Sequence, residues 1–256
     1  MTLEEDIHRY WRLHHYMAPY KFPQKGGGRH LLYIEGHPIE FMTEASGNTM
    51  LILAGNNPST SPCFALELYM DQKTATLQTL ERRPACFIDG HPDSRNLVRA
   101  ATIIAQKRGI RSMTFTDYSH INCPAKVQLA NLSFLTTGST WYESILPITC
   151  SSPICNNLDR YRTLAHTNSW RQVGHGLADI DITGIDIDAP GSAMAVMAAM
   201  KEAKEYCWFY HKYMGTLLMR SGIESLHGTE WTCHIPLIPE RGRTTRKRSS
   251  TNRRTM

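Results

Sequence analysis

Short stretches of apolar residues predict β-strands in the first third of the chain. Residues 31–34 and 50–53 are apolar runs bounded by glycine, asparagine or proline, which is typical of strands. Apolar and polar positions alternate over residues 64–69, and residues 74–80 are again rich in β-favouring types after a turn. The pattern therefore predicts a meander of antiparallel strands that ends in a hairpin.

A pattern of helical period follows this meander. Residues 86–88 predict one more short strand, and a helix with apolar residues about 3.6 positions apart begins near residue 94. Gly109 ends that helix, and a further strand follows it. Residues 85–117 are therefore expected to form a βαβ unit, with parallel strands and a right-handed crossover.

The second half of the chain gives a weaker pattern. Residues 127–135 predict another strand, whereas residues 136–190 are rich in proline, glycine, asparagine and aspartate and show no periodicity. A long helix rich in alanine and methionine is expected from Ser192 to about Arg220. The fold class that follows is α+β, with an antiparallel strand meander leading into one βαβ crossover and a long C-terminal helix.

The composition agrees with one folded domain. Hydrophobic residues make up 41% and charged residues 20% of the 256 positions, which excludes a collagen-like or wholly disordered chain. We expect an irregular or helical lead at residues 1–29, a single α+β domain at residues 30–235 and a disordered tail at residues 236–256. The longest uncharged apolar run, residues 192–200, is too short to span a bilayer, so no membrane partner is expected.

Basic residues gather at the C-terminal end. Seven of the 28 lysines and arginines lie in the last sixteen positions, and subtracting these seven from the formal net charge of +5 leaves −2 for the rest. A basic tail of this kind is expected to bind nucleic acid, or an importin as a nuclear-import signal. The alternative is a solvated tail that keeps the protein in solution. The seven residues are Arg241, Arg243, Arg246, Lys247, Arg248, Arg253 and Arg254.

The seven cysteines are widely spaced and odd in number. Together with an N-terminus unlike a secretory signal, this predicts free thiols and a reducing compartment, the cytoplasm or the nucleus. The closely paired ligands that zinc needs are lacking, so no metal is expected. Asp179 and Asp181 share one face of a possible strand, as two-metal chemistry requires, but a solvated hairpin explains the same alternation.

The loop before the helix at residue 94 is a candidate binding site for an anionic group such as a pyrophosphate. Backbone N–H groups and the helix dipole favour negative charge at a helix N-terminus, and Arg95 adds a positive charge. The candidate cofactor-binding residues are Gly90, His91, Ser94, Arg95 and Asn96.

The order hairpin, strand, helix and parallel strand over residues 63–117 resembles the cofactor-binding core of the GNAT N-acetyltransferases. Asp117-Tyr118-Ser119 followed by LANLSFLTTGSTWY at residues 129–142 is also similar to a segment of divergent acetyltransferase-like proteins of large DNA viruses. This resemblance covers about 80 residues. It implies acetyl-CoA as cofactor, bound by residues 90–96, and transfer of the acyl group to an amine substrate.

The implied chemistry needs a general acid and a general base. Tyr118 or Tyr142 would protonate the leaving thiolate. Glu67 or Asp117 would act as the general base. The alternative is a non-enzymatic scaffold of the same fold, since the loop at residues 89–96 holds a single glycine. Such a scaffold would act through its basic tail on nucleic acid or in the nucleus, the host nucleus if the protein is viral.

Overall fold

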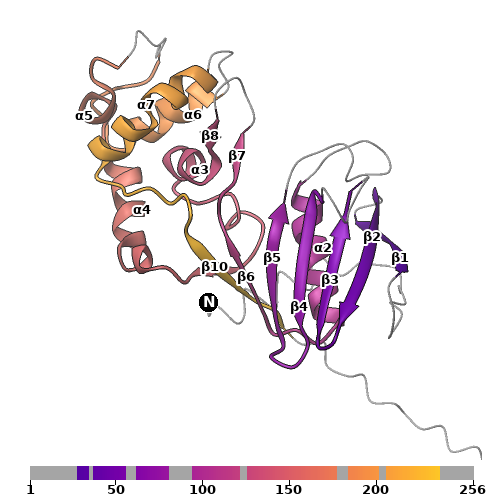
Figure 1. Ribbon diagram of the computed structural model, residues 1–256. Coiled ribbons are helices and arrows are strands. Elements are labelled where there is room, and N and C mark those ends of the chain that lie inside the picture. The colour runs from indigo at the N-terminus through magenta and orange to yellow at the C-terminus, as the bar shows by residue number, and fades with distance from the viewer. Residues whose placement is uncertain are drawn as a thin grey trace, which may run out of the picture.

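A large mixed β-sheet runs through the protein, with one helix on its face and several more at one end (Figure 1). The computed structural model describes residues 28–34, 37–55, 62–80, 94–121, 126–177, 184–201 and 206–236. The predicted α+β class is confirmed.

Several sequence predictions fall outside the described residues. They are the lead up to residue 27, the strand at residues 86–88, the loop residues Gly90 and His91, the aspartates Asp179 and Asp181, and the basic tail from residue 237 onward.

Five consecutive strands form an antiparallel meander at one end of the sheet. These strands are β1 (Gly28–Ile34), β2 (His37–Ser46), β3 (Thr49–Ala54), β4 (Phe64–Tyr69) and β5 (Thr74–Leu80). Each pairs with the next strand along the chain. Leu66 and Leu68 of β4 are fully buried, whereas Glu67 between them faces the other side of the sheet. The expected meander is therefore confirmed.

Helix α2 (Ser94–Lys107) crosses over from β5 to β6 (Ser112–Thr116). β6 pairs in parallel with β5 over three positions, from Thr74 with Ser112 to Thr76 with Thr114. Beyond these positions the two strands no longer pair, and Figure 1 shows them diverging toward their carboxyl ends. α2 packs against β1, β4 and β5 through its periodic apolar face. As the sequence predicts, the helix stops just before Gly109, whose φ of 71° closes it in the left-handed region.

The βαβ unit differs from the one expected at residues 85–117. Its first strand is β5, and β6 is paired on one edge with β5 and on the other with β10 (Glu230–His234). The parallel neighbour of β6 among the described strands is therefore β5, and the strand expected at residues 86–88 lies outside the described residues.

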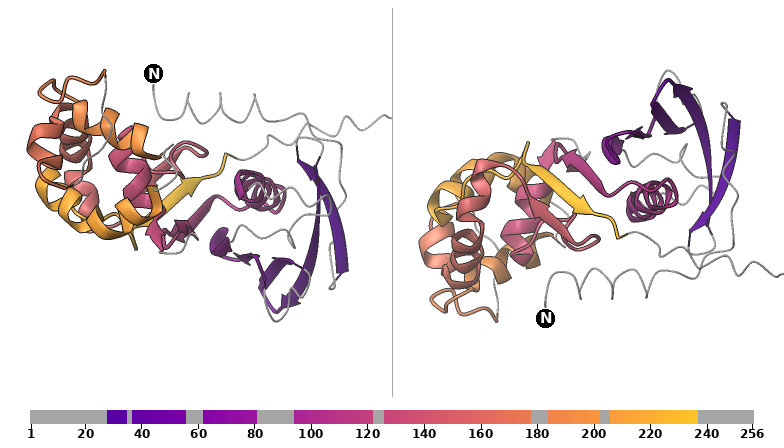
Figure 2. Two further views of the ribbon diagram at one scale, coloured as in Figure 1. Left: turned by 90° about the horizontal axis from the view of Figure 1, so that it is seen from above. Right: turned by 90° about the horizontal axis from the view of Figure 1, so that it is seen from below.

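Helices fill the segment between β6 and β10 and lie at the opposite end of the sheet from the meander (Figure 2). They are α3 (Leu129–Thr137), the 3₁₀ helix η2 (Pro153–Asn157), α4 (Leu158–Thr167), α5 (Trp170–Gly174), α6 (Ser192–Lys201) and α7 (Tyr206–Ser221). A small hairpin of β7 (His120–Ile121) and β8 (Val127–Gln128) precedes α3, and the edge strand β9 (Ile148–Cys150) pairs with β10.

Two sequence predictions in this part are corrected. Residues 129–137 form helix α3 and not a strand. Every residue from Ala130 to Thr136 is buried, the polar ones included, so the segment has no exposed face whose spacing would indicate a helix. The segment expected to be one long helix holds α6 and α7. The Tyr210 hydroxyl donates a hydrogen bond to the Met197 carbonyl, a contact between residues that would lie about 20 Å apart along one straight helix.

The cysteines also depart from expectation. Cys150 and Cys155 form a disulfide with each other. Cys63 and Cys207 also each take part in a disulfide bond, whereas Cys233 is a buried free thiol. The expectation of free thiols is therefore wrong, because sequence spacing does not show which cysteines the fold brings together. The cytoplasmic or nuclear location loses the support of the cysteine count and stays a prediction. No helix in the described segments is long and apolar enough to cross a membrane.

Two glycines are expected to respond to alanine with opposite signs. Gly109 needs its positive φ, so Gly109→Ala should lower the free energy of unfolding by about 1 to 2 kcal/mol. Gly215 lies on the exposed side of α7 with open space around its Cβ position, so Gly215→Ala should raise it by about 0.5 to 1 kcal/mol. Urea unfolding with an unchanged m-value measures both. A stabilised Gly109→Ala protein would contradict the assigned end of α2.

Candidate functional site

A buried carboxyl group lies directly after the last residue of β6. The side chain of Asp117 has 0% exposed surface, and its Oδ1 accepts hydrogen bonds from the backbone N–H of Ser119 at 3.0 Å and from the Ser119 hydroxyl. Its Oδ2 has no hydrogen-bond partner among the described residues. Because buried polar atoms are almost always paired, an unpaired carboxylate oxygen marks a place where the protein holds a polar group ready for a ligand.

Burial raises the pKa of Asp117 above its usual range. The hydrogen bonds from Ser119 and the charge of His227 act in the opposite direction but do not outweigh the loss of solvent. A carboxyl group with a raised pKa is a stronger proton acceptor than an exposed one when it is ionised. Asp117 is therefore suited to moving a proton.

Backbone hydrogen bonds hold the loop before β10 beside Asp117. The Asp117 N–H donates to the Thr229 carbonyl at 2.9 Å, and the Gly228 N–H donates to the Asp117 carbonyl at 2.8 Å. This pairing brings in His227, whose Nδ1 is buried and likewise has no partner in the part of the chain that is described. The ring of Tyr118 packs edge-on against His227 at 5.4 Å between ring centroids. Gly228 permits this approach, because a Cβ there would lie 3.2 Å from the Tyr118 ring.

A third unpaired polar atom lies on the same face of the sheet. Trp231 of β10 stands opposite Phe115 of β6, and Phe115 and Asp117 are two residues apart, so all three side chains share one face. The indole Nε1 of Trp231 is buried without a partner among the described residues. Tyr142 completes the group, with its ring centroid 4.3 Å from that of Phe115. We call Asp117, Tyr142, His227 and Trp231 the Asp117 cluster.

The hydroxyl of Tyr142 stays protonated. Burial, and to a smaller extent the negative charge of Asp117, raise the pKa of Tyr142. A phenol that keeps its proton can donate a hydrogen bond. Of the candidates for general acid and general base, Tyr142 and Asp117 therefore lie near each other.

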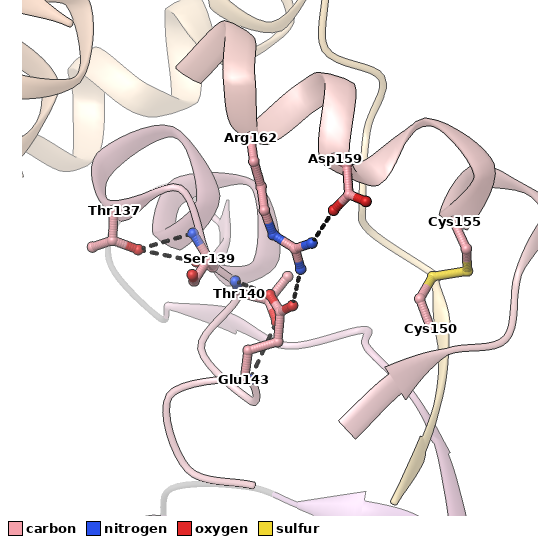
Figure 3. A network of polar contacts seen from close by, with 8 residues as sticks. All are labelled: Thr137, Ser139, Thr140, Glu143, Cys150, Cys155, Asp159 and Arg162. Carbon is pink, nitrogen blue, oxygen red and sulfur yellow. Dashed lines mark hydrogen bonds and ion pairs between the residues drawn. A yellow bond between two sulfur atoms is a disulfide. The ribbon is translucent and has the colours of Figure 1, made fainter. Parts of the chain in front are cut away.

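The turn that carries Tyr142 is anchored to helix α4 (Figure 3). Glu143 accepts a hydrogen bond from the Thr140 N–H at 2.7 Å, and the Thr140 hydroxyl accepts from the Glu143 N–H at 3.4 Å, which together form a capping box. Arg162 of α4 forms ion pairs with Glu143 and, at 2.7 Å, with Asp159. Glu143 therefore has a structural role in fixing the position of Tyr142.

The loop that carries His227 is anchored to helix α3 by a buried amide. Asn131 donates to the Ser225 hydroxyl at 2.9 Å and accepts from the Leu226 N–H at 2.7 Å. The same Ser225 hydroxyl accepts from the His227 N–H at 3.3 Å. Sequence reasoning missed His227 and Trp231 because more than 100 residues separate them from Asp117 along the chain. It missed the role of Asn131 because its contacts with Ser225 and Leu226 also join positions far apart in the sequence.

The other predicted residues lie apart from this cluster. Glu67 faces the opposite side of the sheet, where it accepts hydrogen bonds from the Tyr69 hydroxyl at 2.7 Å and from Gln78. Its strand partner Thr76 lies beside Thr114, on the face of β6 that Asp117 does not share. Glu67 and Asp117 are therefore not neighbours.

The predicted cofactor residues that the structure describes begin helix α2. Ser94 is half-buried, Arg95 is exposed, and Asn96 is buried and accepts a hydrogen bond from Arg99 at 3.4 Å. Because β5 and β6 run parallel, the crossover helix runs back between them, and its N-terminus lies at the end of the sheet where β5 stops. The start of α2 and the Asp117 cluster therefore lie toward the same end of the diverging strands.

No protein-family model matches this sequence, and no curated protein and no solved structure matches it either. Among the described residues, no group of three or more histidine, cysteine, aspartate or glutamate side chains is placed to hold a metal ion. The geometry of the Asp117 cluster is therefore the guide to function.

Replacing Asp117 by asparagine should stabilise the protein at neutral pH. Because the pKa of Asp117 is raised on folding, its contribution to stability is full below the unfolded value of 3.8 and is lost as pH rises through the folded value. The gain in free energy of unfolding of Asp117→Asn over wild type should therefore grow with pH above 4 and then level off. Urea unfolding between pH 4 and 8 measures this gain. Ser119→Ala removes a hydrogen bond to the carboxylate, so the free energy of unfolding of that variant should fall more than that of wild type as pH rises. A gain that shrinks as pH rises would contradict the raised pKa.

Proposed function

We propose that the protein is an acyl-CoA-dependent N-acyltransferase that moves an acyl group from a thioester to an amine. The observation that supports this most is the fully buried Asp117 carboxyl group, with one unpaired oxygen, at the carboxyl end of β6 where β5 and β6 part. In addition, the hairpin, the helix and the parallel strand are three of the four elements in the order hairpin, strand, helix and parallel strand, on which the resemblance to the GNAT N-acetyltransferases rests.

The diverging strands offer a place for the cofactor. Ligands of sheets with parallel strands bind outside the carboxyl ends of the strands, at the point where neighbouring connections separate. Residues 77–80 of β5 do not pair with β6, so this edge of β5 is not joined to its parallel neighbour. Backbone N–H and C=O groups along that edge suit a ligand that carries amide groups, such as the pantetheine arm of coenzyme A.

The start of α2 suits the charged part of the cofactor. Backbone N–H groups of a helix's first turn and the positive end of its dipole attract phosphate groups. α2 is 14 residues long, has no acidic residue in its first turn and carries Arg95 there. A pyrophosphate bound at this point would leave the rest of the cofactor free to follow the edge of β5 toward the Asp117 cluster.

The cluster supplies the groups that acyl transfer requires. The amine nitrogen forms a bond to the thioester carbonyl carbon, the carbon–sulfur bond breaks, and the sulfur leaves as a thiolate. Asp117, with His227 beside it, takes the proton from the amine. Tyr142 donates a hydrogen bond or proton to the leaving sulfur, and Tyr118, which is 64% exposed, is the alternative acid.

Acetyl-CoA should raise the melting temperature of the full-length protein. A ligand at about 100 times its Kd adds about 2.7 kcal/mol to the free energy of unfolding, which raises Tm by several degrees in a chain of this length. Arg95→Ala should weaken the shift, whereas Arg111→Ala, an exposed arginine at the other end of α2, should leave it unchanged. No shift at millimolar acetyl-CoA would contradict the proposal.

Acetyl transfer to a panel of amines should depend on Asp117 more than on Glu67. Loss of a general base lowers kcat by about 10²- to 10⁴-fold, so Asp117→Asn should show a loss of this size while keeping the acetyl-CoA-induced Tm shift. Glu67→Gln is the matched change of a carboxylate on the other face of the sheet. A larger loss in Glu67→Gln than in Asp117→Asn would assign the base to the other face.

A further inference from the structure

We propose that the Cys150–Cys155 disulfide regulates the Asp117 cluster, so that its reduction by a dithiol loosens the wall of the site and lowers its activity. The effect on activity rests on the proposed function. The structural effect does not, because it follows from the contacts that connect the two cysteines to Trp231 and to Tyr142.

The first cysteine lies opposite a residue of the cluster. Cys150 is the last residue of β9 and is the register partner of Trp231 on β10. Its partner Cys155 lies in η2, with 5.5 Å between the two Cα atoms, and the disulfide closes the short loop between them (Figure 3). The covalent bond therefore fixes this loop at the edge of the sheet, next to β10.

The loop inside the disulfide binds β10 at the residue before Trp231. The Ser151 N–H donates to the Glu230 carbonyl at 2.9 Å, and the Ser152 hydroxyl accepts from the Glu230 N–H at 2.8 Å. The hydroxyls of Ser151 and Thr232 are also hydrogen-bonded at 2.6 Å. These bonds hold the segment of β10 that presents Trp231.

The second cysteine leads to the opposite wall of the cluster. η2 ends at Asn157, and α4 begins at the next residue. Arg162 of α4 pairs with Glu143, whose side chain is 15% exposed and which caps the turn that carries Tyr142. The disulfide thus connects the two segments that place Trp231 and Tyr142 around Asp117.

Both cysteines of this disulfide are partly exposed, whereas the other described disulfide-bonded cysteines are almost fully buried. Cys150 and Cys155 are half-buried, whereas Cys63 and Cys207 are only 1% and 7% exposed. Exchange needs a thiolate to reach one of the two sulfur atoms. A dithiol attacks through one thiolate to form a mixed disulfide, and its second thiol then displaces the protein sulfur. The reagent leaves as a disulfide, and Cys150 and Cys155 each gain one electron and one proton.

Reduction removes the covalent connection at a short edge strand of the sheet. β9 has three residues, lies at the edge of the sheet and pairs with β10 alone among the described strands. Without the disulfide its few hydrogen bonds must hold the loop, so local opening becomes easier. Opening breaks the hydrogen bonds of the Glu230 backbone to Ser151 and Ser152. It also leaves β10 at Trp231 paired with β6 alone.

The test uses the full-length protein and graded dithiothreitol. Thiol labelling with mass spectrometry should show Cys150 and Cys155 labelled at concentrations that leave Cys63 and Cys207 unlabelled. In the same samples, hydrogen exchange at the backbone amides of Ser151 and Glu230 should become at least about tenfold faster, the result of a tenfold shift in the opening equilibrium. Peptides from α2 should keep their exchange rate.

Cys150→Ser combined with Cys155→Ser should reproduce the reduced state without reductant. Cys233→Ser, which removes a buried thiol outside the disulfide, should leave the dithiothreitol response of the Ser151 and Glu230 amides intact. If the double variant does not fold, the reduced wild-type protein gives the same comparison. The proposal would be overturned if Cys150 and Cys155 were reduced together with or after Cys63 and Cys207. It would also be overturned if they were reduced selectively while hydrogen exchange at the Ser151 and Glu230 amides stayed unchanged.

Acetyl transfer separates this proposal from the proposed function. A fall in activity that follows the labelling of Cys150 and Cys155, and that returns on reoxidation, supports both. Faster exchange in a protein that shows no acetyl-CoA-induced Tm shift supports the disulfide's control over the cluster and overturns only the acyltransferase. Activity unchanged by selective reduction overturns the regulatory role while the acyltransferase stands.

Discussion

The pairing of β6 on both of its edges is the constraint on which the rest of the structure depends. On one edge it pairs with β5 in parallel near its start, and on the other it pairs with β10 along its whole length. β6 therefore joins the meander to the segment that carries the helices. Because β5 turns away after Thr76, the carboxyl end of β6 is left beside β10 and the loop before it, and Asp117 lies at that end.

The unpaired atoms of the Asp117 cluster cost stability where they are buried. A carboxyl group, an imidazole and an indole each bury a polar atom that has no partner in the described structure. The surrounding contacts are in contrast well satisfied, with Asn131 holding the loop of His227 and Arg162 holding the turn of Tyr142. Unsatisfied groups within a well-anchored frame are typical of sites kept for function.

The helices between β6 and β10 give this site its walls. α3 anchors the loop before β10, and α4 anchors the turn that carries Tyr142, while the disulfide loop fixes the outer edge of the sheet. The Asp117 cluster is therefore supported by three separate parts of the segment between β6 and β10. Under the proposed regulation, such a frame allows a change at the half-buried Cys150–Cys155 disulfide to reach a buried carboxyl group through a few hydrogen bonds and one ion pair.

The sequence by itself determined the elements whose signals are local. The hairpin of β4 and β5, the helix α2 and its end at Gly109 follow from alternation, helical period and a positive φ, which depend only on residues close along the chain. Asp117 and Tyr142 were among the four candidates that the resemblance implied, with Glu67 and Tyr118 as the alternatives, and their catalytic roles stay a proposal. Tertiary structure alone decided that β5 is the parallel neighbour of β6, that residues 129–137 form a buried helix, and that Cys150 bonds to Cys155. It alone brought His227 and Trp231 to Asp117, because strand pairing joins residues about 110 positions apart that share no local pattern.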